Sequence, residues 1–319
     1  TGSDVALKPV EMEAIVVSEE VGNKPVKIAL QADTHVNFDD QQLDLNSLSV
    51  QGLGLDVKGD LKATKIIDAP EYAGKLDVAP FNLRQFMRQL KIKPPVMADA
   101  TALKTVAMQT EIAGSKTDLK LNKFSAQLDE SKIKGDLSVQ NFDKPVVRFG
   151  FDIDQIDADR YLPPKPEEGE GKVPAPAVAQ GKGGEKPAKI PGETLRKLDV
   201  QGDVNIGSLV ISKAHLNQVK VSVKGKDGII KVDPIAARLY QGTHAGNITM
   251  DVTGKTPKLT INSNIQNVQV EPLLKDMTGK AKARGVVNFS TAVVGVGATA
   301  PAIKRTLNGQ LGFSVKNGA

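Results

Sequence analysis

The sequence predicts a mainly β protein, built as an elongated, twisted antiparallel sheet of repeated β units with short capping helices. The first observation is alternation. Val147, Phe149, Phe151 and Ile153 are separated by single polar or small residues, a pattern that gives a strand one apolar face. The second is a Gly-x-Leu/Ile marker, followed ten or eleven residues later by a proline. It occurs as Gly59-Asp60-Leu61 before Pro70, Gly135-Asp136-Leu137 before Pro145, and Gly246-Asn247-Ile248 before Pro257. This recurrence indicates a repeated unit.

The first half of the chain predicts strands and one helix. Residues 1–25 contain no long apolar run, and no element is predicted there. Asn82 can cap a two-turn helix that ends before Pro94-Pro95, because apolar residues follow it at i, i+3, i+4 and i+7. Slips in the alternation near Leu45 and Leu48 indicate turns or bulges. The predicted strands lie at 28–32, 43–50, 53–57, 76–78, 106–112, 119–124 and 133–139.

The second half repeats this arrangement. After the strand at Val147, Asp157 can cap a short helical turn that the following prolines stop. Other short helices are predicted at 195–198, at 270–277 and near Ile303. Further strands lie at 204–211, 219–223, 229–232, 237–240, 259–265, 287–293 and 311–315.

Residues 163–192 separate the two halves and have a different composition. The segment holds seven prolines and six glycines and lacks aromatic residues, so it cannot bury enough apolar surface to offset the entropy lost on ordering. A disordered linker is predicted, with an ordered proline-rich arm lying on the sheet as the alternative. The predicted domains are N-terminal β-groove repeats over 1–162, the linker, and C-terminal β-groove repeats over 193–319.

The composition excludes several classes of protein. Without cysteine there is no disulfide framework and no thiolate metal site, and the redox compartment stays open. The formal net charge of +5 comes from dispersed lysines, without the aromatic-interleaved basic patch typical of nucleic-acid binding. No apolar run reaches the roughly 18 residues needed to cross a membrane, and no signal peptide opens the chain. We expect a soluble segment that does not bind nucleic acid.

Candidate catalytic and metal-binding residues lack the required spacing. His35, His215 and His244 share no ligand or triad spacing, and we interpret them as ordinary strand or turn residues. Asp157 and Asp159 begin a faint likeness to a calcium loop, but its sixth position is leucine and prolines break it. Capping and solvation of a helical turn explain these carboxylates better.

Two glycine motifs also fail as cofactor sites. Gly295-x-Gly297-x-x-Ala300 matches a dinucleotide fingerprint, but the helix after it is short and no acidic residue lies near the expected position. The segment 181–184 lacks the first glycine and the Ser/Thr of a phosphate loop. No enzyme activity, metal site or cofactor is therefore predicted.

Five segments of the chain together follow the pattern of a known family. They are Ile156-Asp157-Ala158-Asp159-Arg160-Tyr161-Leu162-Pro163-Pro164, the low-complexity insertion, Leu195-Arg196-Lys197-Leu198-Asp199-Val200-Gln201-Gly202, Ala237-Arg238-Leu239-Tyr240-Gln241-Gly242, and Leu307-Asn308-Gly309-Gln310-Leu311. In order and spacing they resemble the AsmA family of bacterial envelope proteins. The resemblance is best over 149–319 and only general before it.

The resemblance implies a protein of the Gram-negative periplasm that is anchored to the inner membrane. It implies long, twisted antiparallel sheets curled into a trough, which conduct phospholipid toward the outer membrane or influence outer-membrane assembly. The family's N-terminal membrane helix is missing from this sequence, and relatives continue beyond Ala319. We therefore expect a middle portion of a longer protein.

Alternation leaves two ways to cover an apolar sheet face. In a closed β-sandwich, two such faces pack together. In an open groove, acyl chains take the place of the second layer. The predicted helices are too small to cover extensive sheets, and the repeats indicate elongation, so the groove is preferred. The residues predicted to line it are Val147, Phe149, Phe151, Ile153, Leu259, Ile261, Leu311 and Phe313.

These observations leave three classes of function. The preferred one is a non-enzymatic bridge segment that carries phospholipid between the inner and outer membranes along the apolar groove. The alternative is a periplasmic scaffold that binds an envelope protein at an exposed sheet edge and so influences outer-membrane protein assembly. A hydrolase would depend on the Asp157 and Asp159 pair alone.

Overall fold

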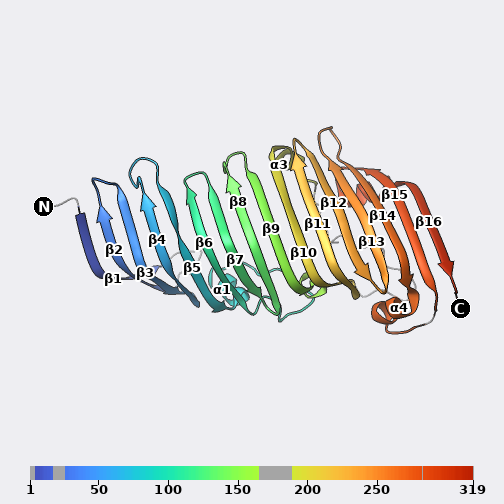
Figure 1. Cartoon of the computed structure of the whole chain (residues 1–319), viewed down its shortest axis with the longest axis horizontal. Helices are drawn as coiled ribbons and strands as arrows, with labels where there is room; N and C mark the ends of the chain where they lie inside the picture. The colour runs from blue at the N-terminus through green and yellow to red at the C-terminus, as the bar shows by residue number, and fades with distance from the viewer. Residues whose placement is uncertain (1–3, 17–25, 165–188, 282, 319) are drawn as a thin grey trace. The chain divides into compact units, whose positions relative to one another are not determined.

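The computed structural model describes residues 4–16, 26–164, 189–281 and 283–318, and within them it is mainly β (Figure 1). Its sixteen strands form an open, largely antiparallel sheet in which the strand order is the chain order, β1 to β16. The strands are β1 Asp4–Val16, β2 Val26–Asn37, β3 Gln42–Gly52, β4 Leu55–Thr64, β5 Glu71–Phe81, β6 Val106–Ser115, β7 Leu119–Leu128, β8 Ser131–Gln140, β9 Val146–Asp157, β10 Asp199–Ile211, β11 Ala214–Lys226, β12 Ile229–Leu239, β13 Gly242–Asp251, β14 Lys258–Gln269, β15 Val286–Val296 and β16 Asn308–Lys316.

Five short helices accompany the strands in this part of the chain. They are α1 Leu83–Gln89, α2 Ala158–Tyr161, α3 Gly192–Lys197, α4 Val270–Thr278 and α5 Ala300–Arg305. The predicted caps of the first two are confirmed. The Asn82 side chain accepts a hydrogen bond from the Gln85 amide, and the Asp157 side chain accepts one from the Asp159 amide.

The chain divides into two compact units. Unit 1 comprises residues 1–96 and 100–143, and unit 2 comprises residues 97–99 and 144–319. Unit 1 therefore holds β1 to β8 with α1, and unit 2 holds β9 to β16 with the other four helices. The predicted linker falls mostly on residues 165–188, which lie outside the described residues, so the predicted domain limits stay a prediction.

The strand pairs of unit 1, from β1–β2 to β7–β8, are antiparallel, and one row of paired residues crosses all eight strands. The row runs through Met12, Leu30, Val50, Val57, Val78, Met108, Ala126 and Ile133. Directly paired residues project from the same face of a sheet. Unit 1 thus has an aliphatic face that extends from its first strand to its last.

Unit 2 differs in that its first two strands, β9 and β10, are parallel. The connection over 158–198 returns the chain to the end of the sheet where β9 began, as a parallel pair requires. The remaining pairs, from β10–β11 to β15–β16, are antiparallel. The purely antiparallel sheet predicted from the sequence is therefore correct except at this pair.

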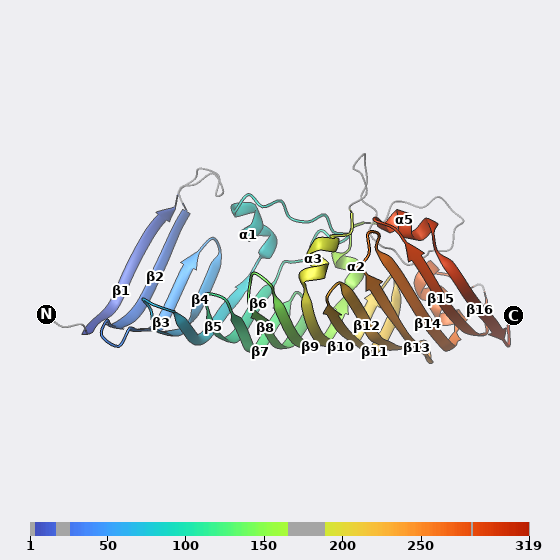
Figure 2. The same ribbon diagram turned by 90° about the horizontal axis from the view of Figure 1, so that it is seen from above.

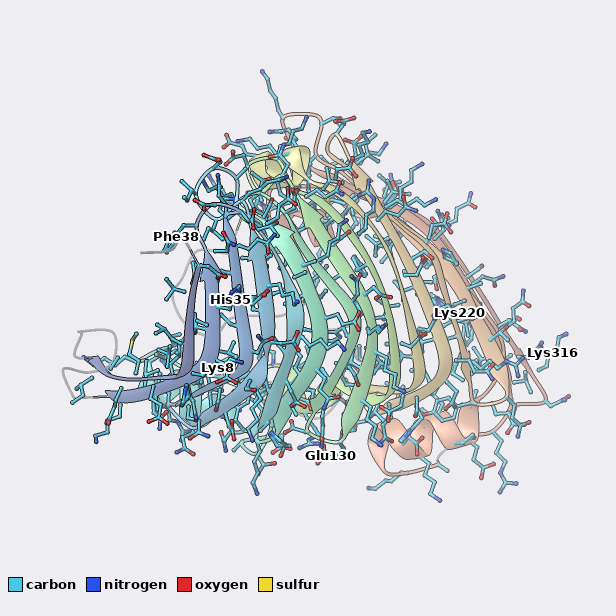
Figure 3. All side chains as sticks on the ribbon, turned by 60° about the vertical axis from the view of Figure 1, so that its left-hand side comes forward. Lys8, His35, Phe38, Glu130, Lys220 and Lys316 are labelled. Carbon is cyan, nitrogen blue, oxygen red and sulfur yellow. The ribbon has the colours of Figure 1, made fainter. Side chains whose placement is uncertain are left out.

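The predicted bulge near Leu45 and Leu48 is confirmed, since the register of β3 against β4 shifts between these residues. Similar shifts occur in both units, and residues with positive φ lie at four of them: Ser47, Lys123, Gln218 and Asn267. Bulges bend a strand and increase its twist. Figure 3 shows strands that bend along their length, including β1 and β2 near Lys8.

No second sheet layer covers the strands that the structure describes, so the closed β-sandwich is wrong. Consistent with this, only eight hydrophobic residues are buried in the described part of the chain. They are Ala32, Ala102, Leu103, Val219, Ala237, Val252, Val268 and Ile303. Most apolar side chains of the strands are instead only partly covered. The open alternative is the observed one.

Three strand predictions are wrong, two of them at prolines. The third is β13, which none of the predicted strands covers. β1 was not predicted, although Val10, Met12 and Ala14 alternate with glutamates, because Pro9 interrupts the pattern. The segments 229–232 and 237–240 belong to a single strand, β12, whose register shifts between Val232 and Ile235. Proline is tolerated in edge strands and at bulges, and these are its positions here.

Candidate functional site

The candidate site is one face of the unit 2 sheet, and β9 defines it. Val147, Phe149, Phe151 and Ile153 alternate with polar or small residues, and the Phe149 and Phe151 rings stack with centroids 5.7 Å apart. Their direct partners on β10 are Val200, Gly202, Val204 and Ile206. Successive odd residues of β9 therefore project from one face together with aliphatic residues of β10.

The register carries this face across the unit to β14. Phe149 belongs to a row that continues through Gly202, Val223, Val232 and Ile248 to Ile261. Val147 belongs to a row that continues through Val200, Gly225, Ile230 and Met250 to Leu259. Two predicted residues of β14 thus lie on the same face as the predicted residues of β9.

The last two predicted residues lie on β16 and project from this face as well. Leu311 pairs with Thr291 and Phe313 pairs with Phe289 on β15. They are the most exposed of the eight, at 71 % and 70 %. All eight predicted residues therefore share one face, which we call the apolar face of unit 2, although they are spread over β9, β14 and β16.

Glycines on the apolar face make room for large neighbours. A Cβ atom on Gly202 would meet the Phe149 ring at 2.5 Å. On Gly59 of unit 1, a Cβ atom would collide with the backbone carbonyl oxygen of Lys75. The recurring Gly-x-Leu/Ile marker thus has a steric basis, since its glycine lies on the same face as the apolar residue two positions later.

Three polar side chains interrupt the apolar face of unit 2, and sequence reasoning missed them as a group. His244 on β13 and Ser263 on β14 share a hydrogen bond of 2.9 Å between Nε2 and Oγ. Thr291 on β15 is the direct partner of Ser263. Burial lowers the pKa of the His244 imidazole, so it is neutral near pH 7. We call these three residues the polar patch.

The opposite face of unit 2 is polar. Asn205 donates a hydrogen bond of 2.8 Å to Asp152, Asn262 donates one of 2.9 Å to Asn247, and Ser222 donates one to Asp203. Lys220, labelled in Figure 3, lies on β11 among these outward positions. The two faces thus differ as alternation predicts, with one aliphatic and one hydrated.

Polar contacts at the strand ends hold the helices of unit 2 in place. The Asp159 carboxylate accepts hydrogen bonds of 2.6 Å from the amides of Ser212 and Lys213 in the β10–β11 turn. Arg160 forms an ion pair of 2.7 Å with Asp99. The aspartates that faintly resembled a calcium loop therefore cap a helix and a hairpin, which agrees with the capping interpretation and adds a turn that the sequence did not predict.

α3, α4 and α5 make comparable contacts. Arg196 of α3 donates a hydrogen bond of 2.7 Å to the carbonyl oxygen of Val252. Tyr240 donates one of 2.7 Å to Asp276 of α4, and burial is the main cause that raises the pKa of Tyr240 to about 12. Figure 2 shows α3 and α5 beside the ends of the unit 2 strands. The described helices of unit 2 therefore lie at the ends of its strands.

The rejected dinucleotide motif has a packing role. A Cβ atom on Gly295 would meet Ile303 at 2.8 Å, and one on Gly297 would meet the Ile303 amide at 2.6 Å. Ile303 of α5 is 5 % exposed. These glycines therefore allow α5 to lie directly on the end of β15.

No group of three or more potential metal ligands occurs in the described ranges. The three histidines were interpreted as strand or turn residues, and they lie on β2, β11 and β13. Their neighbours differ: His35 contacts Asp4 at 2.6 Å, His215 lies 3.9 Å from Asp276, and His244 pairs with Ser263. The apolar face of unit 2 can therefore bind apolar ligands, and its polar patch provides a few hydrogen-bonding groups.

Among the described residues, no helix has the length and hydropathy needed to cross a membrane. Comparison with curated proteins and with solved structures found no match. Comparison with protein families matched the AsmA family model over residues 7–319, nearly the whole chain. The chain therefore belongs to the AsmA family.

Proposed function

We propose that this chain is a non-enzymatic lipid-transfer segment, in which phospholipid acyl chains lie on the apolar sheet faces. One observation carries the proposal: the apolar face of unit 2 extends over eight strands, and the described residues form no second layer on it. An aliphatic surface of this extent is stabilised when a ligand removes it from water. Val147, Phe149, Phe151, Ile153, Leu259, Ile261, Leu311 and Phe313 line the proposed path.

The dimensions of unit 2 suit a diacyl lipid. Eight strands spaced by about 4.8 Å place the first and last about 34 Å apart. One acyl chain spans roughly half of a bilayer core of about 30 Å. Each CH₂ group removed from water contributes about 0.8 kcal/mol, so a chain lying across several strands gains many such contributions. Weak, similar contacts along the path favour binding without trapping the lipid.

Membership of the AsmA family supplies the proposed setting. In the full-length protein we place this segment in the periplasm, anchored to the inner membrane and carrying phospholipid toward the outer membrane. The partners are then the two membranes and the acyl chains of their lipids. The polar outward face remains in contact with water.

The test is to purify the chain from a Gram-negative host and analyse an organic extract by mass spectrometry. We expect phospholipid at a level approaching one molecule per chain. An outward substitution, Gln201→Asp, should leave that level unchanged, since Gln201 is exposed and lies beside Arg148 and Lys224 on the polar face. An extract free of phospholipid would contradict the proposal.

A second candidate function is an assembly scaffold, and β16 favours it. All nine residues of this strand are exposed, and its single charged side chain is Lys316. Among the described strands it pairs only with β15, so its other edge offers unpaired backbone groups to an added strand. Binding of an unfolded outer-membrane barrel protein by a lipid-free chain, weakened by Leu311→Lys, would support the scaffold.

A further inference from the structure

The polar patch is an exception on the apolar face of unit 2. His244, Ser263 and Thr291 occupy inward positions on three successive strands. The apolar face includes the rows that begin at Val147, Phe149, Phe151 and Ile153 and the row from Ala237 to Phe313. The other residues of these rows are only Val, Ile, Leu, Phe, Met, Ala or Gly. Polar groups on an apolar surface are costly unless they have hydrogen-bond partners. Their partners therefore indicate what they do.

In either tautomer of the neutral imidazole, the hydrogen bond between His244 and Ser263 uses only one of the two hydrogen-bond donors of the pair. If Nε2 carries the proton and donates to Ser263 Oγ, the serine hydroxyl is left to donate elsewhere. If Nδ1 carries the proton, the serine donates to Nε2, and the Nδ1 N–H is left. One donor is thus available to an acceptor from outside the protein.

Thr291 adds a second hydroxyl at the same place. It is the direct cross-strand partner of Ser263, and no protein hydrogen bond to its side chain is found among the described residues. The position across from Ser263 on β13 is Gly246, which has no side chain to cover the hydroxyl. The patch therefore combines two available donors on neighbouring strands of one face.

Unit 1 provides a contrasting case. Thr110 also lies inward, as the partner of Leu76, but it is 5 % exposed, and its hydroxyl is within 3.2 Å of the carbonyl oxygens of Glu111 and Asn122. The protein itself satisfies this hydroxyl at a bulge. No described residue offers the polar patch such a backbone acceptor, which points to a ligand.

We propose that His244, Ser263 and Thr291 form a hydrogen-bonding site for the ester carbonyl oxygens of a diacyl glycerolipid whose chains lie on the apolar face of unit 2. This inference rests on the proposed function and adds the part of the lipid that is recognised. An ester carbonyl is the acceptor closest to the acyl chains, so it can reach donors in the middle of an apolar surface. None of the rows places a cation there to hold a phosphate.

The test is a competition between two lipids that differ only in this acceptor. The purified, delipidated chain is incubated with vesicles holding equal amounts of dioleoyl phosphatidylcholine and its diether analogue, then repurified, and bound lipid is quantified by mass spectrometry. One hydrogen bond is worth about 0.5–1.5 kcal/mol, so we expect diester to exceed diether about 2- to 10-fold.

The variants are Ser263→Ala, Thr291→Val and a triple substitution that adds His244→Leu to these two. Ser263→Ala and Thr291→Val each remove a hydroxyl with little change in volume. The triple variant also removes the imidazole N–H and should bring the ratio close to one. Ile261→Val is the matched control on the neighbouring inward position of β14, and it should lower the binding of both lipids equally. The urea midpoint of every variant verifies folding.

The outcomes separate the two proposals. Equal binding of diester and diether by the original chain would overturn the carbonyl site and leave the lipid path standing. A preference that survives the triple substitution would also overturn the site. Binding of neither lipid would overturn the proposed function, and the site with it. A preference lost only in the patch variants would support both.

Discussion

The two units build similar apolar faces and treat inward polar side chains differently. In unit 1, Thr110 gives its hydroxyl to backbone carbonyl oxygens at a bulge. In unit 2, His244 and Ser263 bond to each other and leave a donor over. The comparison teaches that an inward polar side chain is not by itself a sign of a binding site. Its hydrogen-bond partner decides: a backbone partner indicates a structural residue, and a donor without a protein partner indicates a candidate binding residue.

The units also secure their strand ends differently. In unit 1, the Asp129 carboxylate is 7 % exposed and accepts hydrogen bonds from three successive amides, of Leu103, Lys104 and Thr105. In unit 2, Asp159 accepts two, from a hairpin turn. Both carboxylates hold a connecting segment at a strand end. The number of amides that each carboxylate accepts from predicts how much it contributes to the free energy of unfolding.

The largest expected effect is at Asp129. Asp129→Ala leaves three amides without their acceptor in a buried place, and we expect a loss of about 3 kcal/mol in the free energy of unfolding. Asp159→Ala should cost about 2 kcal/mol, because two amides lose their acceptor and water reaches them more easily. Urea denaturation measures both, with exposed Asp143→Ala as the control. Equal losses of unfolding free energy in Asp129→Ala and Asp143→Ala would show that the hydrogen bonds to Asp129 do not stabilise the fold.

The next effect concerns the glycines of the two apolar faces. Gly59→Ala in unit 1 should cost about 2 kcal/mol, since the new Cβ meets a backbone carbonyl. Gly202→Ala in unit 2 should cost about 1 kcal/mol, because the Phe149 ring can shift. Gly150→Ala is the control: it projects into open space and should be neutral or slightly stabilising. A smaller loss of urea midpoint in Gly59→Ala than in Gly150→Ala would contradict the steric explanation of the Gly-x-Leu/Ile marker.

The smallest effect is a pH dependence at His244. Its pKa in the folded chain is below the ordinary value of 6.5, so the unfolded chain binds the proton at a higher pH. Stability should therefore fall as pH drops below about 6.5, until the folded imidazole also takes up the proton. His244→Gln should show a smaller loss between pH 7.5 and 5.5. An unchanged loss in this variant would show that burial does not depress the imidazole pKa.

Most strands and the shared face of the eight predicted residues could be predicted from alternation, because the side-chain period of a strand is local. The β9–β10 parallel pair could not, since strand direction depends on the path of the 158–198 connection. β1 and the intact β12 were hidden by Pro9 and Pro234, which a strand tolerates only at an edge or a bulge.

The polar patch required knowledge of the register. Taken singly, His244 is one more histidine on a strand, and Ser263 and Thr291 are ordinary strand residues. They become neighbours only through the pairings of β13 with β14 and of β14 with β15. A bulge between Ile265 and Val268 shifts the register of β14 against β15, so these pairings do not follow from the sequence. Extending the alternation of Ile248 and Ile261 along their strands would have marked His244 and Ser263 as inward, but not as neighbours.

The central claim is that the apolar face of unit 2 carries lipid, and the most direct test combines stability with lipid content. Phe149→Asp and Phe151→Asp each place a carboxylate on this face. Because the face is open, the carboxylate stays hydrated, and we expect a loss of about 1 kcal/mol in unfolding free energy. Co-purified phospholipid should fall to less than half, while Gln201→Asp on the polar face keeps the full amount. A folded Phe151→Asp variant with its full phospholipid content would contradict the claim.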